Sequence, residues 1–398
     1  MHPTGPVAQR FPLVARHRPA CLPLNARVGR LCELADTASR QADPGLASTV
    51  FNQAALLASD LDLPDYAREL CHRHAALYLA RGPLPAMSAI RGLEPIVNLA
   101  RLHIRAGRHQ RGHQLLLDLY SAVITATGTV LDGIVVPARL TETDQQRGEV
   151  RTWLWRVVIA DGTRALTSAS RWTDALRHIE EHRGIGRRIL DGRQTAVLAA
   201  ATTGNLPGAL ALLDDTEPGA PWEDAVTSVL TALCRPGCQE SAEVAVAECL
   251  AYEPAEGLAV FSTRLALTAL DAAGPGSPAA QHLLNQLTSR TSESGDGYAL
   301  RDLLVHEDVV NRLAPDRAAT LNRILATCAL GSATLPRAIQ DRLETGLDLA
   351  REAIERSPFD SRSPDSDPLD RHHSRSTPPP NGPGTRGASL TSPADQPT

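Results

Sequence analysis

Apolar residues recur at intervals of three and four along most of this sequence. Leu46, Val50 and Ala54 show the spacing near the start of the chain, and Leu283 and Leu287 show it near the end. These intervals place side chains on one face of an α-helix. An all-α fold is therefore predicted, in which helices bury their apolar faces against one another.

The sequence also resembles itself at an offset of 34 residues. TRALTSASRWTDALRHIEEH, which starts at Thr163, aligns without gaps with VLAAATTGNLPGALALLDDT, which starts at Val197. ARLHIRAGRHQRGHQLLLDL, from Ala100, is a third copy, and weaker copies are NQAALLASDLDLPDYARELC, LALTALDAAGPGSPAAQHLLNQL and ILATCALGSATLPRAIQDRL. Each copy has a turn between two helical segments, and a period of this length indicates stacked helix pairs.

Small residues, a helix-breaking turn and one bulky residue recur at fixed places in the three best copies. The pattern resembles the tetratricopeptide repeat (TPR) over roughly residues 30 to 350, although only two adjacent copies keep the strict period. The resemblance implies an irregular TPR-like α-solenoid of antiparallel helix pairs. The matching positions are Ala100, His103, Gly107, His109 and Gly112; Thr163, Leu166, Ser170, Trp172 and Ala175; and Val197, Ala200, Gly204, Leu206 and Ala209.

Two segments flank the expected helical-repeat domain, which spans residues 25–356. Residues 1–24 contain many prolines and show no periodicity, and residues 357–398 form a Pro/Ser/Gly-rich tail. Neither composition can bury enough apolar surface to offset the entropy lost on ordering the chain. Both termini are therefore predicted to be disordered.

An insertion at about residues 124–148 interrupts the helical pattern. Within it, TVLDGIVV places β-branched residues on both sides of Asp132-Gly133, which is the sequence of a tight hairpin turn. A short β-hairpin is predicted here. Long insertions in compact domains are often functional, so Asp132 and Gly133 mark a candidate element for gripping a partner or capping the array.

All 40 basic residues are arginine, and the absence of lysine excludes several catalytic mechanisms. Schiff-base lysines, the P-loop lysine, the kinase strand lysine and Ser-x-x-Lys dyads are all missing. The abundance of Ala, Arg, Gly and Pro is typical of a GC-rich genome. The formal net charge of -5 indicates no strongly basic surface, so direct DNA binding is disfavoured.

Nothing in the sequence indicates a membrane span or an export signal. No window approaches 18 uninterrupted apolar residues, and proline or arginine breaks each apolar run near the N-terminus. A cytoplasmic location is expected. The seven cysteines are scattered and odd in number, which argues against a disulfide framework. Cys234, Cys238 and Cys249 could bind a metal as three thiolates, but we interpret them as buried thiols of the helix core.

The stretch RHIEEHR contains His178-x-x-Glu181-His182, the written signature of the inverted zinc peptidases. Two histidines four residues apart on a helix can share a metal, and the glutamate could act as a base. Any helix with several histidines also produces such pairs by chance, and His109 and His113 form a second one. We interpret His178 and His182 as the polar edge of a repeat helix and expect no metal or cofactor.

The TPR resemblance implies that the first helix of each pair lines a concave groove. The groove positions carried over are Asn52, Asn98, Asp161 and Thr195, followed three residues later by Arg101, Arg164 and Leu198 in the last three pairs. Amides can hold a peptide main chain, and guanidinium groups suit carboxylates. In the TPR family such residues clamp the carboxylate end of a peptide. The competing interpretation is a solvated helix surface.

A second group of arginines lies in the run GIGRRILDGRQ, residues 184–194. Arg187, Arg188 and Arg193 surround two glycines there and could bind a phosphate or an acidic segment. The alternative is a linker between helices with exposed arginines. The linker is the favoured interpretation, and Arg187 and Arg188 stay candidates for partner binding.

These observations favour a non-catalytic adaptor or regulator that binds a peptide or a protein partner in a concave groove in the cytoplasm. The alternative is an accessory subunit, or an unrecognised enzyme, in the modification of a peptide metabolite. A zinc-dependent peptidase built on His178, Glu181 and His182 is the least favoured function. The pattern leaves the oligomeric state open.

Overall fold

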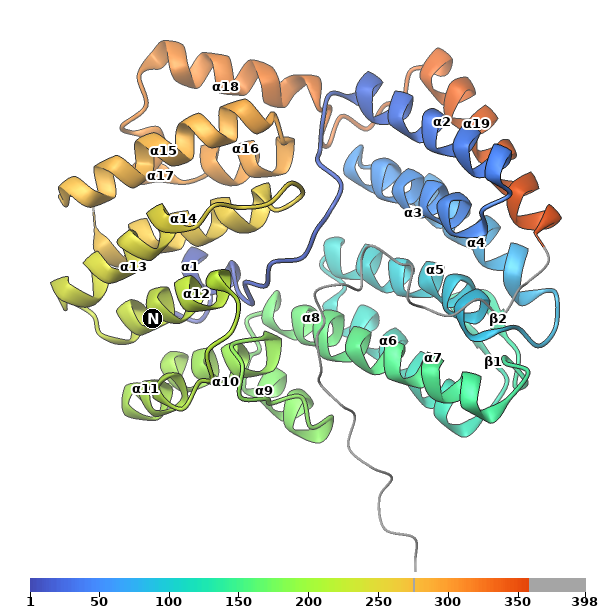
Figure 1. Ribbon diagram of the computed structural model, residues 1–398, viewed down its shortest axis with the longest axis horizontal. Coiled ribbons are helices and arrows are strands. Elements are labelled where there is room, and N and C mark those ends of the chain that lie inside the picture. Colours follow the sequence, from blue (N-terminus) through green and yellow to red (C-terminus); the bar gives the residue numbers. More distant parts are fainter. Residues whose placement is uncertain (275, 358–398) are drawn as a thin grey trace, which may run out of the picture.

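The computed structural model describes residues 1–274 and 276–357 and is almost entirely helical (Figure 1). The predicted all-α class is confirmed. The elements are α1 (Pro6–Gln9), α2 (Leu24–Gln41), α3 (Pro44–Asp60), α4 (Pro64–Leu79), α5 (Ala86–Arg105), α6 (His109–Thr125), β1 (Thr129–Leu131), β2 (Ile134–Val136), α7 (Asp144–Val157), η1 (Val158–Gly162), α8 (Thr163–Thr167), α9 (Trp172–Glu181), α10 (Asp191–Thr202), α11 (Leu206–Asp214), α12 (Pro221–Cys234), α13 (Gln239–Ala251), α14 (Ala259–Ala273), α15 (Pro278–Ser294), α16 (Gly297–Leu304), α17 (Glu307–Val310), α18 (Pro315–Thr327) and α19 (Arg337–Arg356).

Several helices begin where the sequence supplies a side-chain cap or a proline. Asp43 accepts hydrogen bonds from the first main-chain amides of α3, and Thr143 and Gln146 form a capping box at α7. Proline occupies the first turn of several helices, where its missing N–H costs nothing. Local sequence therefore fixes many helix starts before any tertiary contact forms.

The helices form two stacks, each with its own hydrophobic core. Helices α2 to α7 pack in order in the first stack, and α9 to α18 follow in the second (Figure 1). Helix η1, a single π turn, and the short α8 join the stacks. Helix α19 returns across the molecule and packs against α2 and α3, so the last helix belongs to the first core.

The turns of the three best sequence copies have the expected conformation. Gly107 between α5 and α6 has φ of 74°, and Gly204 between α10 and α11 has φ of 86°. Ser170 occupies the equivalent place between α8 and α9 and also has a positive φ, 59°. A left-handed residue is what ends one helix and redirects the chain into the next. The 34-residue alignment therefore locates real helix pairs.

The predicted hairpin is also present. Strands β1 and β2 pair antiparallel with Leu131 opposite Ile134, and both turn residues, Asp132 and Gly133, have positive φ. That combination defines the two-residue turn that matches the twist of a hairpin. Leu131 and Ile134 are buried, whereas Val130 and Val135 are more than 60% exposed. One face of the hairpin therefore packs on the first stack.

The expectation for residues 1–24 is not met, because this segment is packed into the protein. We call residues 1–23 the strap. It runs from α1, beside the second stack, up between the two stacks to α2 (Figure 1). Ala8, Phe11 and Leu13 are at most 2% exposed and belong to the second core. The composition argument fails here since an extended segment can bury its few apolar residues against a surface formed by distant parts of the chain. The expected disorder of the tail concerns residues 358–398, which lie outside the described residues.

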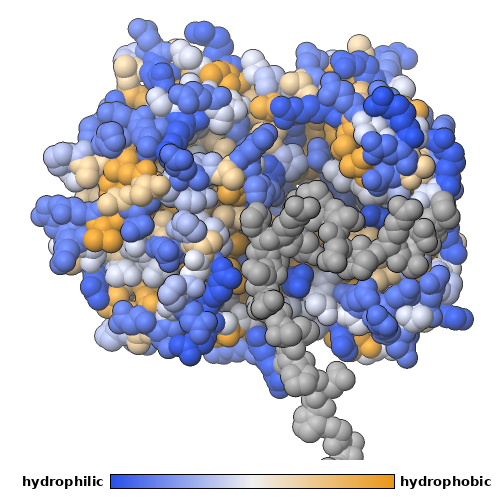
Figure 2. Space-filling view, viewed as in Figure 1, coloured by the Kyte–Doolittle hydropathy of each residue, from blue (hydrophilic) through white to orange (hydrophobic). Residues whose placement is uncertain are grey.

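Apolar residues on the outer surface are dispersed. In the space-filling view, the visible rim of both stacks is mostly hydrophilic, and apolar residues form separate patches (Figure 2). Within residues 1–274 and 276–357, no helix combines the length and apolar character needed to cross a membrane.

The two stacks meet at Asp60, the last residue of α3. Its carboxylate accepts hydrogen bonds from Arg27 of α2 (2.5 Å), Arg105 of α5 (3.2 Å) and the Tyr298 hydroxyl of α16. The Asp60 carbonyl also accepts the amide of Gly331, in the segment that leads to α19. The Asp60 side chain is only 4% exposed. This carboxylate therefore links both ends of the helical array.

Replacing Asp60 by Asn should lower the free energy of unfolding by about 3 kcal/mol, because the buried Arg27 guanidinium loses its charge partner. Urea unfolding followed by circular dichroism measures the effect. Asp36, an exposed residue of α2, supplies the control: Asp36→Asn should change the free energy by less than about 0.5 kcal/mol. Equal effects of the two substitutions would show that the junction is dispensable.

Candidate binding site on the inner wall

Side chains from both stacks line the space through which the strap runs. We call this set the inner wall: Asn52, Glu94, Asn98, Arg101, Asp161, Arg164, Asp191, Gln194, Asp271 and Tyr298. They come from α3, α5, η1, α8, α10, α14 and α16, so no single helix makes the site. The wall divides into a part that holds the strap and a part beside it.

Main-chain atoms of the strap are held by side chains of the wall and by Trp172 of α9. The Leu13 amide donates to Gln194 Oε1, and Gln194 Nε2 donates back to the Leu13 carbonyl, both at 2.6 Å. Arg164 donates to the Pro12 carbonyl at 3.1 Å, and the Trp172 indole N–H donates to the Pro3 carbonyl at 2.9 Å. Because these contacts engage peptide groups, they do not depend on the side chains of the segment that is bound.

Two arginines of the strap pair with aspartates of the wall. Arg16 meets the two carboxylate oxygens of Asp191 with both terminal nitrogens, at 3.1 and 2.5 Å, and Arg10 pairs with Asp271. Burial disfavours the ionised form of Asp271, but hydrogen bonds from His306 and Arg10 outweigh it and lower its pKa. The ion pairs make Asp191 and Asp271 receptors for guanidinium groups.

Four of the sequence-predicted groove residues form a hydrogen-bonded ladder. Glu94 accepts from Asn52 (2.7 Å), Asn52 accepts from Asn98 (2.9 Å), and Asn98 accepts from Arg101 (3.0 Å). Arg101 then meets both carboxylate oxygens of Asp161, at 2.9 and 2.8 Å. The Arg101 side chain remains 50% exposed. The TPR-based positions therefore select residues that the fold does bring together.

The ladder and the strap adjoin at Asp161. Burial disfavours its charge, yet Arg101, Arg16 and Arg164 together lower its pKa. Arg164 stands beside Arg264 and Arg16, and burial first, then these neighbours, lower its pKa to about 10. Arg101 is thus already neutralised by Asp161, and Arg164 is engaged with a carbonyl. The wall lacks the pair of free guanidinium groups that we expected to clamp a carboxylate.

The other groove and linker candidates have different positions. Thr195 and Leu198 are fully buried in α10. Arg187 pairs with the exposed Asp215 and Glu217, and Arg188 pairs with Glu223 at the start of α12. These pairs brace the second stack and do not involve the strap or the ladder.

Arg193 corrects the expectation of exposed arginines in GIGRRILDGRQ. Its side chain is 4% exposed and donates to the Leu212 and Gly186 carbonyls. The same run contains Asp191 and Gln194, the strongest receptors of the strap, which sequence reasoning missed. We interpreted the run as a linker, but α10 begins at Asp191, so both residues lie on a helix.

The histidines of the zinc-peptidase signature form a cluster without the orientation of a metal site. His178 is 4% exposed; Nε2 donates to the Val158 carbonyl of η1 at 3.0 Å, and Nδ1 lies 3.2 Å from His113 Nε2. His182 Nδ1 bonds the His178 carbonyl, and Glu181 is exposed. Both ring nitrogens of His178 are therefore engaged within the protein.

The remaining candidates also have structural surroundings. Asp132 is held by Arg68 (2.7 Å) and His103 (3.2 Å), which ties the hairpin turn to α4 and α5. Cys234 and Cys249 are buried in the second core. Over the part of the chain that the structure describes, no group of three His, Cys, Asp or Glu side chains is placed to hold a metal.

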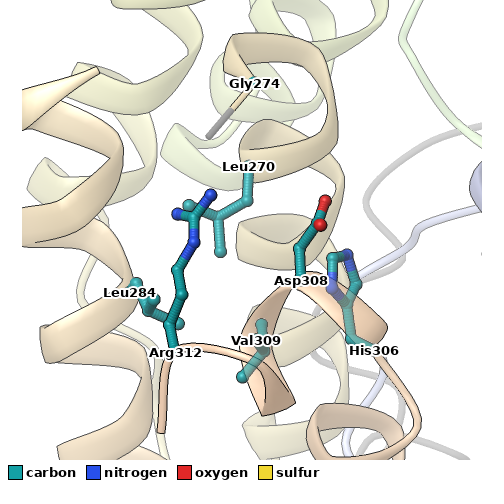
Figure 3. Close-up of a pocket in the computed structure, with 7 residues that line it drawn as sticks. All are labelled: Leu270, Gly274, Leu284, His306, Asp308, Val309 and Arg312. Carbon is teal, nitrogen blue, oxygen red and sulfur yellow. The ribbon is translucent and has the colours of Figure 1, made fainter. Parts of the chain in front are cut away.

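A small pocket lies between α14, α15 and α17 (Figure 3), and one of its lining residues, His306, hydrogen-bonds to Asp271 of the inner wall. Its lining residues include Leu270, His306 and Arg312, and it has room for about one water molecule. It is therefore too small for a substrate or cofactor, and the inner wall is the stronger candidate site.

Replacing Gln194 by Leu should release the strap. Two main-chain groups of Leu13 then lose their partner inside the protein, at about 1 to 3 kcal/mol for each unsatisfied group. Tryptic cleavage after Arg10 and Arg16 should accelerate at least about tenfold, because it reports local opening. Gln114→Leu, at an exposed site on α6, is the control and should leave the rate unchanged. Equal rates for both variants would contradict the assigned role.

The histidine cluster should make stability sensitive to acid. Burial, together with the neighbouring His182 and His113, lowers the pKa of His178 to about 4, although its bond to Val158 opposes the shift. The unfolded chain therefore binds the proton first, near pH 6.5, and stability falls as the pH drops below that value.

Between pH 7 and pH 5 this single group should reduce the free energy of unfolding by about 2 kcal/mol. Urea unfolding at the two pH values measures it. The His178→Gln variant should lose that part of the pH dependence, whereas His282→Gln, at an exposed position of α15, should keep it. An unchanged slope in His178→Gln would assign the effect to other groups.

Comparison with known proteins identifies no relative of this chain. The chain matches no protein-family model, no curated protein and no solved structure. The contacts between the wall and the strap are therefore the features that indicate a function.

Proposed function

We propose that this protein is a non-catalytic adaptor or regulator that holds an extended peptide segment on its inner wall. The observation that carries the proposal is the grip of Gln194 on Leu13, which engages the amide and the carbonyl of one residue in the manner of a paired strand. Arg164 and Trp172 hold two further carbonyls of the same segment. A surface that binds one extended segment through its peptide groups has the chemistry to bind another.

The exposed part of the wall supports the same function. Beside the strap, the ladder from Asn52 to Asp161 offers amide and guanidinium groups at a half-exposed position, Arg101. Amides can donate to and accept from a peptide main chain in either direction. The TPR-like sequence pattern, in which the first helices of each pair bind peptides, agrees with this location.

A cytoplasmic location belongs to the same proposal. All seven cysteines are free thiols, and five of them are buried. Free thiols are typical of proteins in a reducing compartment.

The test is peptide binding by the full chain. Random linear peptides displayed on phage should enrich on the wild-type protein, and synthetic copies should bind in solution. Asn98→Ala/Arg101→Ala/Arg164→Ala, in one chain, should weaken that binding at least about tenfold, because a combined loss of about 1.4 kcal/mol from the three side chains is sufficient for that change.

The matched control is Asn285→Ala/Arg111→Ala/Arg139→Ala, which removes the same residue types from exposed positions outside the wall. It should bind like the wild type. Circular dichroism must show that both triple variants are folded. Equal binding by the two variants, or no enriched peptide, would overturn the proposed function.

A further inference from the structure

The strap carries a pattern of charge that the wall complements. Residues 1–23 contain arginines at positions 10, 16 and 18 and no Asp or Glu. The side chains that receive them are Asp271, Asp191 and the ring of Tyr298, which lies 3.8 Å below the Arg18 guanidinium. The strap half of the wall is thus an acidic and aromatic receptor for cations.

Two buried apolar residues lie between the two paired arginines, in the stretch whose peptide groups the wall holds. Phe11 and Leu13 are 1% and 2% exposed in the second core, and the carbonyl of the intervening Pro12 is the one that Arg164 holds. The segment therefore presents a cation, two buried apolar residues two positions apart, and a second cation six positions after the first. The receptors for the two arginines, Asp271 in α14 and Asp191 in α10, lie on helices, which gives the spacing of the cations a rigid template.

The strap is also built to be exchanged. It lies outside the helical stacks and leads into α2, and much of its hold comes from polar contacts with main-chain atoms. A tethered segment has a high effective concentration, so it competes with any free ligand. The strap leaves the wall vacant in only a fraction of the molecules. The apparent affinity for a free ligand is the intrinsic affinity multiplied by that fraction.

Building on the proposed function, we propose that the wall binds a segment of a partner protein that has the strap's chemistry, and that the strap is its internal competitor. The ligand class is an extended peptide with two cationic side chains six positions apart, two apolar residues between them, and no acidic residue. Binding inserts the cations at Asp271 and Asp191 and displaces the strap.

The test uses a fluorescein-labelled peptide with the sequence PVAQRFPLVARHR, residues 6–18, and the full chain. Weakening the strap by Arg10→Ala/Arg16→Ala, which leaves the wall intact, should tighten peptide binding at least about tenfold in fluorescence anisotropy. Arg30→Ala/Arg40→Ala, two exposed arginines of α2, is the matched control and should bind like the wild type. A peptide with Glu in place of Arg10 and Arg16 should bind at least about tenfold more weakly.

A second measurement applies to the wild-type chain and does not depend on the folding of a variant. Excess peptide should accelerate hydrogen exchange in residues 7–16 of the chain and should leave exchange in α10 protected. Exchange of the strap that is unaffected by a bound peptide would show that the peptide binds elsewhere and would overturn the proposal.

The outcomes separate this inference from the proposed function. If the strap-weakened chain binds acidic or neutral library peptides and not the basic one, the peptide-binding function stands and the assigned ligand class is wrong. If it binds no peptide, both fail. If the wild-type chain sediments as a dimer that the basic peptide dissociates, the occupant is the strap of a second copy, and the assignment to a partner protein is wrong.

Discussion

The buried carboxylate of Asp60 determines how the rest of the molecule is arranged. It accepts from Arg27 of the first helix after the strap, from Arg105, and from Tyr298 of the second stack. A carboxylate can satisfy several donors at once, and without it the Arg27 side chain, which is 9% exposed, would lose its charge partner. Because α2 starts directly after the strap, this junction also fixes where the strap enters the space between the stacks.

The strap and the stacks are held by different kinds of interaction. The stacks bury aliphatic side chains against one another, which contributes most of the folding free energy. The strap adds a few buried apolar residues to one core and depends otherwise on hydrogen bonds and ion pairs. Such pairs contribute little net stability but define position and partner. A segment held in this way belongs to the part of a protein that opens most readily.

The sequence predicts what is local and periodic. The helical period gives the fold class, Gly107, Ser170 and Gly204 mark the turns, and Asp132-Gly133 marks the hairpin. The TPR-like positions even select the ladder residues. The contacts that failed prediction join residues far apart in the chain without any period: Leu13 and Gln194 are 181 positions apart, and α19 returns to α2. An extended segment has no helical period in its sequence, so the residues that bind it cannot be inferred from the spacing of its side chains.

The π turn η1 explains why the histidine cluster and the wall belong together. It carries Val158, whose carbonyl accepts the His178 N–H, and Asp161, which ends the ladder. Gly162 is required between this turn and the ring, because a Cβ there would lie 2.7 Å from His178 Nε2. Neutral His178 donates from Nε2 and accepts at Nδ1 from His113 Nε2. Protonation of His178 would place an N–H on Nδ1 that faces the N–H of His113, and this hydrogen bond would be lost. The five-residue turn η1 is therefore held at its first residue by His178, and its Asp161 pairs with Arg101 of the wall.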